Sequence, residues 1–231
     1  MCGRFTLTAD PEMIKRAFSL DSVPDLIQPR YNIAPSQPVA VITNENPHKL
    51  TFHRWGLVPS WAKDPKMGNR LINARAETAY EKPSYRAAFK RRRCLIPADG
   101  FYEWQKRGEK DKVPMYIHLK NRELFAFAGL WEVWHGPEGE ELRTCTILTT
   151  APNDLVRPIH NRMAVILDKA DYGDWLSPEE KPSGELMPLL RAYDADQMGV
   201  YEVSRSVNNP YNDTPQLVEP FVPPEQPSLF G

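Results

Sequence analysis

Five segments in the middle of the chain have the composition of β-strands, and they constrain its fold more than any other feature. Each is rich in β-branched and aromatic residues. Charged or glycine-containing turns such as KRGEKDK (106–112) join several of them, as expected of antiparallel pairs. The segments are PVAVIT (38–43), LTFHRWGLV (50–58), VPMYIHL (113–119), LFAFAGLWEVW (124–134) and LRTCTILTT (142–150).

Helical patterns flank these segments. In ADPEMIKRAF, Asp10 stands at an N-cap position and Pro11 at the first helical position, and apolar residues follow on one face. Further helices are expected near 77–90, 152–157, 168–176 and 184–193. Because the strands cluster in the middle and the helices surround them, we expect an α+β fold with a mainly antiparallel, barrel-like β-sheet flanked by short helices.

The expected fold is one domain over residues 1–220, followed by a Pro-rich tail over residues 221–231 that is extended or disordered. The chain has 231 residues, of which 41% are hydrophobic, enough for a real core. No apolar run approaches the ~18–20 residues of a membrane span, and Arg4 and Asp10 stand where a signal peptide needs apolar residues. We therefore expect a cytoplasmic protein without membrane contact.

The cysteine count is low and the net charge is unevenly divided. Cysteines at positions 2, 94 and 145 form no close pair, which argues against a disulfide framework and a zinc site, so no metal or cofactor is expected. Cys94 and Cys145 have apolar neighbours and are expected in the core. Residues 1–106 carry a net charge of +7 and the rest −8, which gives −1 in total. The basic run 90–93 fits either a phosphate-binding face or a solvated helix C-terminus.

The chain begins MCGRFT, with a cysteine directly behind the initiator methionine. Methionine aminopeptidase removes Met1 when the next side chain is small, so we expect the mature chain to begin at Cys2. A terminal cysteine carries an amine and a thiol on adjacent carbons, with pKa values of about 7.7–8.0 and about 8.5. Cys2 would then offer two nucleophiles in one residue.

Five internal segments mix polar functional groups with aromatic and turn residues. They are RYNIAPSQ (30–37), RWGLVPSWAKD (54–64), LINARAET (71–78), CLIPADGFYEWQK (94–106) and IHNRMAV (159–165). Together with the initial MCGRF, and in this order, they resemble the SRAP family, the SOS-response-associated peptidase domain proteins. The resemblance covers residues 2 to about 220.

The resemblance implies an activity that suits Cys2. SRAP proteins act in the DNA damage response, where they capture the aldehyde of an abasic site in single-stranded DNA through the terminal cysteine as a thiazolidine crosslink. It also implies three helper residues. Asn73 would hold Cys2 and the sugar in reacting geometry, Glu103 would shuttle protons at nitrogen, and His160 would protonate the sugar ring oxygen as the ring opens. A monomer is expected.

The residues expected to contact DNA come from the same motifs. Arg4, Arg75 and Arg162 each lie two residues beyond a predicted catalytic residue, a spacing that on a strand puts both side chains on one face. Asn32 matches a family position near the substrate, and Trp61 matches an aromatic on which bases stack. One departure is Ala164, where the family usually has proline, and this affects the placement of Arg162.

Two other functions remain compatible with these residues. Cys2, His160 and Glu103 could act as a cysteine peptidase, and removal of Met1 could even be autoproteolytic. A non-catalytic single-stranded DNA-binding module is the second alternative. A glutamine amidotransferase also begins with cysteine, but its Asn-Gly-Glu stretch and fused synthase domain are missing from this sequence.

Overall fold

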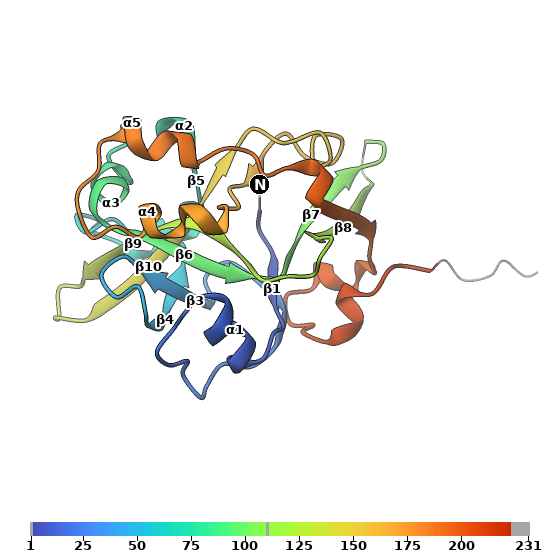
Figure 1. Cartoon of the computed structure of the whole chain (residues 1–231), viewed down its shortest axis with the longest axis horizontal. Coiled ribbons are helices and arrows are strands. Elements are labelled where there is room, and N and C mark those ends of the chain that lie inside the picture. Colours follow the sequence, from blue (N-terminus) through green and yellow to red (C-terminus); the bar gives the residue numbers. More distant parts are fainter. Residues whose placement is uncertain (1, 110, 223–231) are drawn as a thin grey trace, which may run out of the picture.

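The computed structural model describes residues 2–109 and 111–222, and it contains two β-sheets (Figure 1). In the larger sheet, strand pairing runs from β10 through β4, β3, β6 and β9 and returns to β10, so five strands close into a barrel. All these pairs are antiparallel except β4 with β10. The strands are β3 (Pro38–Thr43), β4 (Leu50–Trp55), β6 (Arg93–Ala98), β9 (Phe125–His135) and β10 (Glu141–Thr150), and β10 also pairs with β5 (Asn73–Arg75) and β11 (Met163–Ala164).

The second sheet has five strands in the order β12, β8, β7, β1, β2, all antiparallel. They are β12 (Met198–Glu202), β8 (Lys112–Leu119), β7 (Gly100–Lys106), β1 (Phe5–Leu7) and β2 (Arg30–Ile33). The chain passes from the barrel to this sheet at Asp99, whose carboxylate accepts hydrogen bonds from Thr6 and Thr8. Figure 1 shows β1 between the barrel on the left and β7 and β8 on the right.

Short helices lie around the outside of the sheets (Figure 1). They are α1 (Pro11–Ala17), α2 (Ala76–Ala79), α3 (Arg86–Arg91), α4 (Tyr172–Trp175) and α5 (Ser183–Leu186), with 3-10 turns at Pro65–Arg70, Lys169–Asp171, Met187–Leu189, Ala195–Gln197, Arg205–Asn208 and Pro215–Val218. Helix α1 begins where the sequence predicts, because the Asp10 carboxylate accepts a 2.8 Å hydrogen bond from the Met13 backbone N–H.

The predicted α+β class and the barrel-like, mainly antiparallel sheet are confirmed. All five predicted strands are present. LTFHRWGLV leaves the sheet after Trp55, where Gly56 has a φ of +131° and a side chain there would lie 2.6 Å from the Gly68 carbonyl oxygen. The predicted tail lies outside the described residues from position 223 onward.

The predicted helices differ more from the structure. Residues 77–90 form two short helices, α2 and α3, instead of one. Residues 168–176 contain only the short α-helix α4, and the range 184–193 overlaps the short helix α5, which begins one residue earlier. The helix predicted at 152–157 is wrong, since residues 154–159 form turns. The remaining strands were not predicted, and β1, β2, β5 and β11 have only two to four residues each, too few to show alternation.

The core is shared between the barrel and the second sheet. The Phe5 ring of β1 lies 5.2 Å from Trp55 and 5.7 Å from Phe127 of the barrel, both edge-on. Cys94 and Cys145 are fully buried in this core, as predicted. Among the described residues, no helix has the length and the apolar character required to cross a membrane.

The basic run 90–93 is not a uniform surface. Arg93 is fully buried, and its guanidinium donates hydrogen bonds of 2.7–2.9 Å to three backbone carbonyl oxygens in segment 175–179. Arg92 is paired with Glu132 at 2.6 Å. Neither the phosphate-binding nor the solvated interpretation therefore applies to Arg93, which joins the barrel to the α4 region instead.

A buried histidine of β4 predicts how stability depends on pH. His53 is 1% exposed, and neither ring nitrogen has a hydrogen-bond partner among the described residues. Burial, aided by Arg143, lowers the pKa of His53 from 6.5 to about 4. The unfolded chain therefore takes up a proton near pH 6.5 that the folded chain takes up only near pH 4. We expect folding stability to fall by about 3 kcal/mol across this interval, measured by urea unfolding.

His53→Leu should remove this part of the acid sensitivity, since leucine has no proton to gain. The matched control is His135→Gln, at the exposed end of β9, which should keep the slope of the unchanged protein. Equal slopes of unfolding free energy against pH for His53→Leu and the unchanged protein would contradict the prediction.

Candidate active site around Cys2

Cys2 lies three residues before the first residue of β1 and is fully buried. Its Sγ is 3.9 Å from the Arg4 carbonyl oxygen, a weak hydrogen bond. Burial raises the pKa of the Cys2 thiol, and the charge of Glu103 raises it further. The thiol is therefore neutral at pH 7, and the charge of Glu103 is felt at its sulfur.

Asn73 is bonded directly to Cys2, although 71 residues separate them. Its side-chain amide donates a 2.7 Å hydrogen bond to the Cys2 carbonyl oxygen. The parallel pairing of β5 with β10 holds Asn73 opposite Ile147, and the Tyr85 hydroxyl donates to the Asn73 carbonyl at 3.2 Å. The Asn73 Oδ1 atom is buried without a hydrogen-bond partner among the described residues, so its capacity to accept a hydrogen bond is unused.

Glu103 lies in β7, next to the segment that carries Cys2. The Tyr102 backbone N–H donates to the Arg4 carbonyl at 2.9 Å, which fixes β7 beside residues 2–4. Glu103 is 2% exposed, and burial raises the pKa of its carboxyl group from 4.5 to about 7. A carboxyl group with this pKa can both accept and return a proton at neutral pH.

His160 lies in the connection between β10 and β11 and is half-buried, and burial lowers its pKa. The pairing of β10 with β5 and β11 brings this connection near β5, because Thr149 lies opposite both Arg75 and Ala164. His160 Nδ1 is 3.0 Å from the backbone nitrogen of Arg162 and 3.1 Å from its carbonyl oxygen.

Arg4 and Asn32 form a joint anchor beside the site. The Arg4 guanidinium donates to Asn32 Oδ1 at 2.7 Å and to the Val207 carbonyl oxygen at 2.8 Å, and it lies over the Trp104 ring at 5.8 Å. Asn32 is fully buried, and its amide nitrogen donates at 2.6–3.3 Å to three carbonyl oxygens in segment 207–212. Asn32 therefore orients Arg4 and this loop instead of presenting its own amide to solvent.

The other two arginines differ in accessibility. Arg75 is exposed at the end of β5. Arg162 is 16% exposed, and its guanidinium forms a bidentate ion pair with Glu77 at 2.7 and 2.8 Å. Only Asn73 and Arg75 share a strand, so strand alternation does not apply to Arg4 and Arg162, which precede β1 and β11.

Two aromatic side chains project from anchored loops. Trp61 is 58% exposed, while its neighbour Ala62 is held by a 2.7 Å hydrogen bond from Trp134 Nε1. Tyr211 is 91% exposed, in the loop that Asn32 anchors. Neither Tyr211 nor Glu77 is among the residues predicted from the sequence. A single aromatic in the polar stretch NNPYND was the available signal for Tyr211, and Glu77 had none beyond its place in the LINARAET motif.

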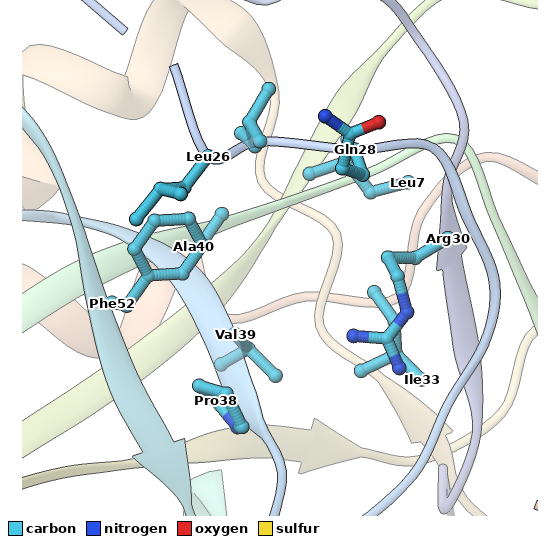
Figure 2. A pocket seen from close by; sticks show the side chains of 10 residues that line it. Leu7, Leu26, Gln28, Arg30, Ile33, Pro38, Val39, Ala40 and Phe52 are labelled. Atoms are coloured by element: carbon cyan, nitrogen blue, oxygen red, sulfur yellow. The ribbon is translucent and has the colours of Figure 1, made fainter. Parts of the chain in front are cut away.

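An apolar groove of about 380 Å³ lies elsewhere on the molecule (Figure 2). Leu7, Leu26, Val39 and Phe52 line it, and Arg30 stands at one side. Arg30 is already paired with Asp213 at 2.5 Å. The groove shares no lining residue with the predicted site.

Comparison with known proteins identifies relatives along most of the chain. The model of a family described as SOS response associated peptidase (SRAP) matches residues 1–210. Abasic site processing protein YoqW of Bacillus subtilis (strain 168) is 50% identical over 222 residues, which cover 95% of this chain and 99% of that protein. Abasic site processing protein HMCES of Gallus gallus is 33% identical over 265 residues, which cover 96% of this chain and 78% of that protein.

Solved structures share the fold. A crystal structure of a protein from Bacteroides thetaiotaomicron has a TM-score of 0.85 and 27% sequence identity, covering 96% of this chain and all of that one. A crystal structure of a protein from Bordetella bronchiseptica has a TM-score of 0.76 and 28% identity, covering 88% of this chain.

Proposed function

The chain belongs to the SOS response associated peptidase (SRAP) family, and on that premise we propose that it captures abasic sites in single-stranded DNA as a covalent crosslink through Cys2. The observation that carries the proposal is the pair of groups at Cys2. The Asn73 amide donates to its carbonyl oxygen at 2.7 Å, and the charge of Glu103, a buried carboxyl group with a pKa of about 7, raises the pKa of its thiol. Relatives named abasic site processing proteins support it.

The proposed reaction begins at the amine of Cys2 after removal of Met1. The amine nitrogen adds to the aldehyde carbon of the opened sugar, and loss of one water leaves an imine. The thiol then adds across the C=N bond, with sulfur bonding to carbon and the thiol proton ending on nitrogen. The product is a five-membered thiazolidine, which an internal cysteine cannot form because its nitrogen is part of a peptide bond.

The helper residues fit distinct steps. Asn73 holds the Cys2 backbone and offers Oδ1 to the substrate. Glu103 removes a proton from the attacking nitrogen and returns one when the carbinolamine loses water. His160 delivers a proton to the ring oxygen as the C1′–O bond of the closed sugar breaks, while the C1′ hydroxyl loses its proton to water.

The surroundings of the thiol favour this order over peptidase chemistry. A cysteine peptidase needs a thiolate, and its cysteine has a depressed pKa. Here burial and Glu103 raise the pKa of the Cys2 thiol. An amine that attacks first, followed by a neutral thiol that closes the ring, matches these surroundings better than acyl transfer to a thiolate.

Single-stranded DNA is the proposed substrate because two of the residues predicted to contact DNA, Trp61 and Arg75, are exposed. Trp61 presents a ring on which an unpaired base can stack, worth about 1–3 kcal/mol per base. Arg75 is exposed two residues from Asn73, and its guanidinium is the group that we expect to bind a phosphate. A paired and stacked base would first have to leave the duplex, which costs a few kcal/mol.

One three-part assay tests the proposed function. The protein is incubated with a single-stranded oligonucleotide that contains one abasic site, and the mixture is run on a denaturing gel. We expect a covalent band with this oligonucleotide and none with an intact one. Parallel samples are tested for peptide hydrolysis and for a native gel shift. Peptide hydrolysis without a covalent band would support the peptidase, and a native shift alone would support a non-catalytic binding module.

A further inference from the structure

Glu77 joins two segments that the proposed function places at the reaction centre. It lies in α2, four residues after Asn73, and its carboxylate binds both terminal nitrogens of Arg162, 85 residues away in sequence. The same guanidinium donates to the Thr149 carbonyl oxygen at 2.6 Å. Arg162 thus ties the loop that carries His160 to α2, which directly follows the strand of Asn73, and to β10.

The Arg162 backbone in turn contacts the His160 ring. Both its nitrogen and its carbonyl oxygen lie within 3.1 Å of Nδ1. The N–H can donate to a bare Nδ1, and the carbonyl can accept from a protonated one, so one residue satisfies Nδ1 in either protonation state. Nε2 is then the nitrogen that exchanges a proton with the substrate.

We propose that Glu77 is a positioning residue for His160, and that its ion pair with Arg162 fixes the 160–162 loop so that Nδ1 stays bonded to the Arg162 backbone and Nε2 delivers the proton that opens the sugar. The proposal rests on the proposed function for the identity of the reaction. In this proposal the main role of Arg162 is to fix the 160–162 loop. Arg75 is then the exposed arginine that would bind a DNA phosphate.

The charge state of the pair agrees with this role. Hydrogen bonds from Arg162 lower the pKa of Glu77, so its carboxylate is charged wherever the reaction is run near neutral pH. A bidentate pair between a carboxylate and arginine also fixes the orientation of the guanidinium plane, which a single hydrogen bond does not.

The first test is a double-mutant cycle on the crosslinking rate. Glu77→Gln should slow capture of the abasic site by about tenfold, part of the roughly 10²–10⁴ that a positioned acid contributes. In a His160→Ala background, Glu77→Gln should have no further effect, because the residue through which it acts is gone.

Glu77→Asp, which keeps the charge, should recover part of the rate. Glu202→Gln, which removes the 2.8 Å pair with Arg107, is the matched control and should leave capture unchanged. Additive losses in the double variant would overturn the proposal.

A DNA-binding measurement distinguishes two roles of Glu77, positioning of His160 and competition with DNA phosphate for Arg162. An oligonucleotide with a tetrahydrofuran site has no aldehyde and cannot crosslink, so it reports affinity alone. Glu77→Gln should bind it as tightly as the unchanged protein. Tighter binding with a steeper salt dependence and an unchanged capture rate would mean that Glu77 instead keeps Arg162 away from a phosphate, and would overturn the proposal.

A third readout does not depend on any activity. The ring ¹⁵N signals and titration midpoint of His160, assigned with the His160→Ala variant, should change in Glu77→Gln and stay unchanged in Glu202→Gln. Identical His160 signals in Glu77→Gln and the unchanged protein would refute positioning even if crosslinking were confirmed. A changed signal without any crosslink would support the positioning and count against the proposed reaction.

Discussion

Replacing Cys2 by alanine should abolish the denaturation-resistant complex with abasic single-stranded DNA. Alanine keeps a terminal amine but has no thiol, so the reaction should stop at the imine, which water hydrolyses. Borohydride should still trap this imine as a stable amine, whereas without borohydride the denaturing gel should show no covalent band.

The matched control is Cys145→Ala, which removes another fully buried thiol and should keep full crosslinking. A form with an uncleaved extension before Cys2 has the Cys2 nitrogen in a peptide bond, so it cannot close the thiazolidine and should give no band without borohydride. Equal adduct yield from that form without borohydride would rule out the Cys2 amine as the nucleophile.

Glu103→Gln should slow capture by about 100-fold at pH 8 and lengthen the life of the finished adduct. Glutamine keeps the size of the side chain but cannot take up or return a proton, and such proton transfer contributes roughly 10²–10⁴ in rate. Burial raises the pKa of Glu103 to about 7, so its carboxylate fraction rises from about a tenth at pH 6 to about nine tenths at pH 8.

The effect of Glu103→Gln on the capture rate should increase with pH. The ratio of the rate of the unchanged protein to that of Glu103→Gln should grow by about tenfold between pH 6 and pH 8, because only the unchanged protein gains a base over that interval. The ratio also cancels the titration of the Cys2 amine, which both proteins share. A constant ratio over this interval would show that Glu103 does not act as the base.

His160→Ala provides a comparison that separates the two groups. It should slow capture without preventing it, because abasic sugars open spontaneously at a low rate and the Cys2 amine remains. The measurement is a time course of crosslinking, followed by release into excess competitor abasic DNA, at several pH values. Indistinguishable capture and release profiles for His160→Ala and Glu103→Gln would contradict the separate roles assigned to them.

The sequence by itself determined the features that depend on neighbouring residues. Asp10 and Pro11 start α1 because a cap and a fixed φ act within one turn. The five predicted strands follow from their β-favouring composition, and β3 has the predicted bounds, Pro38–Thr43. The six ordered motifs, with Cys2 in the first of them, were sufficient to indicate the family.

Only the tertiary structure decided which of those motif residues meet and what occupies their polar atoms. Asn73 reaches Cys2 because β5 pairs with β10, while Asn32 is buried by the 207–212 loop and Arg162 is held by Glu77. Arg93, in the most basic run of the chain, is fully buried. A polar side chain takes its partners from residues tens of positions away, and burial sets its pKa, so neither can be read from local pattern.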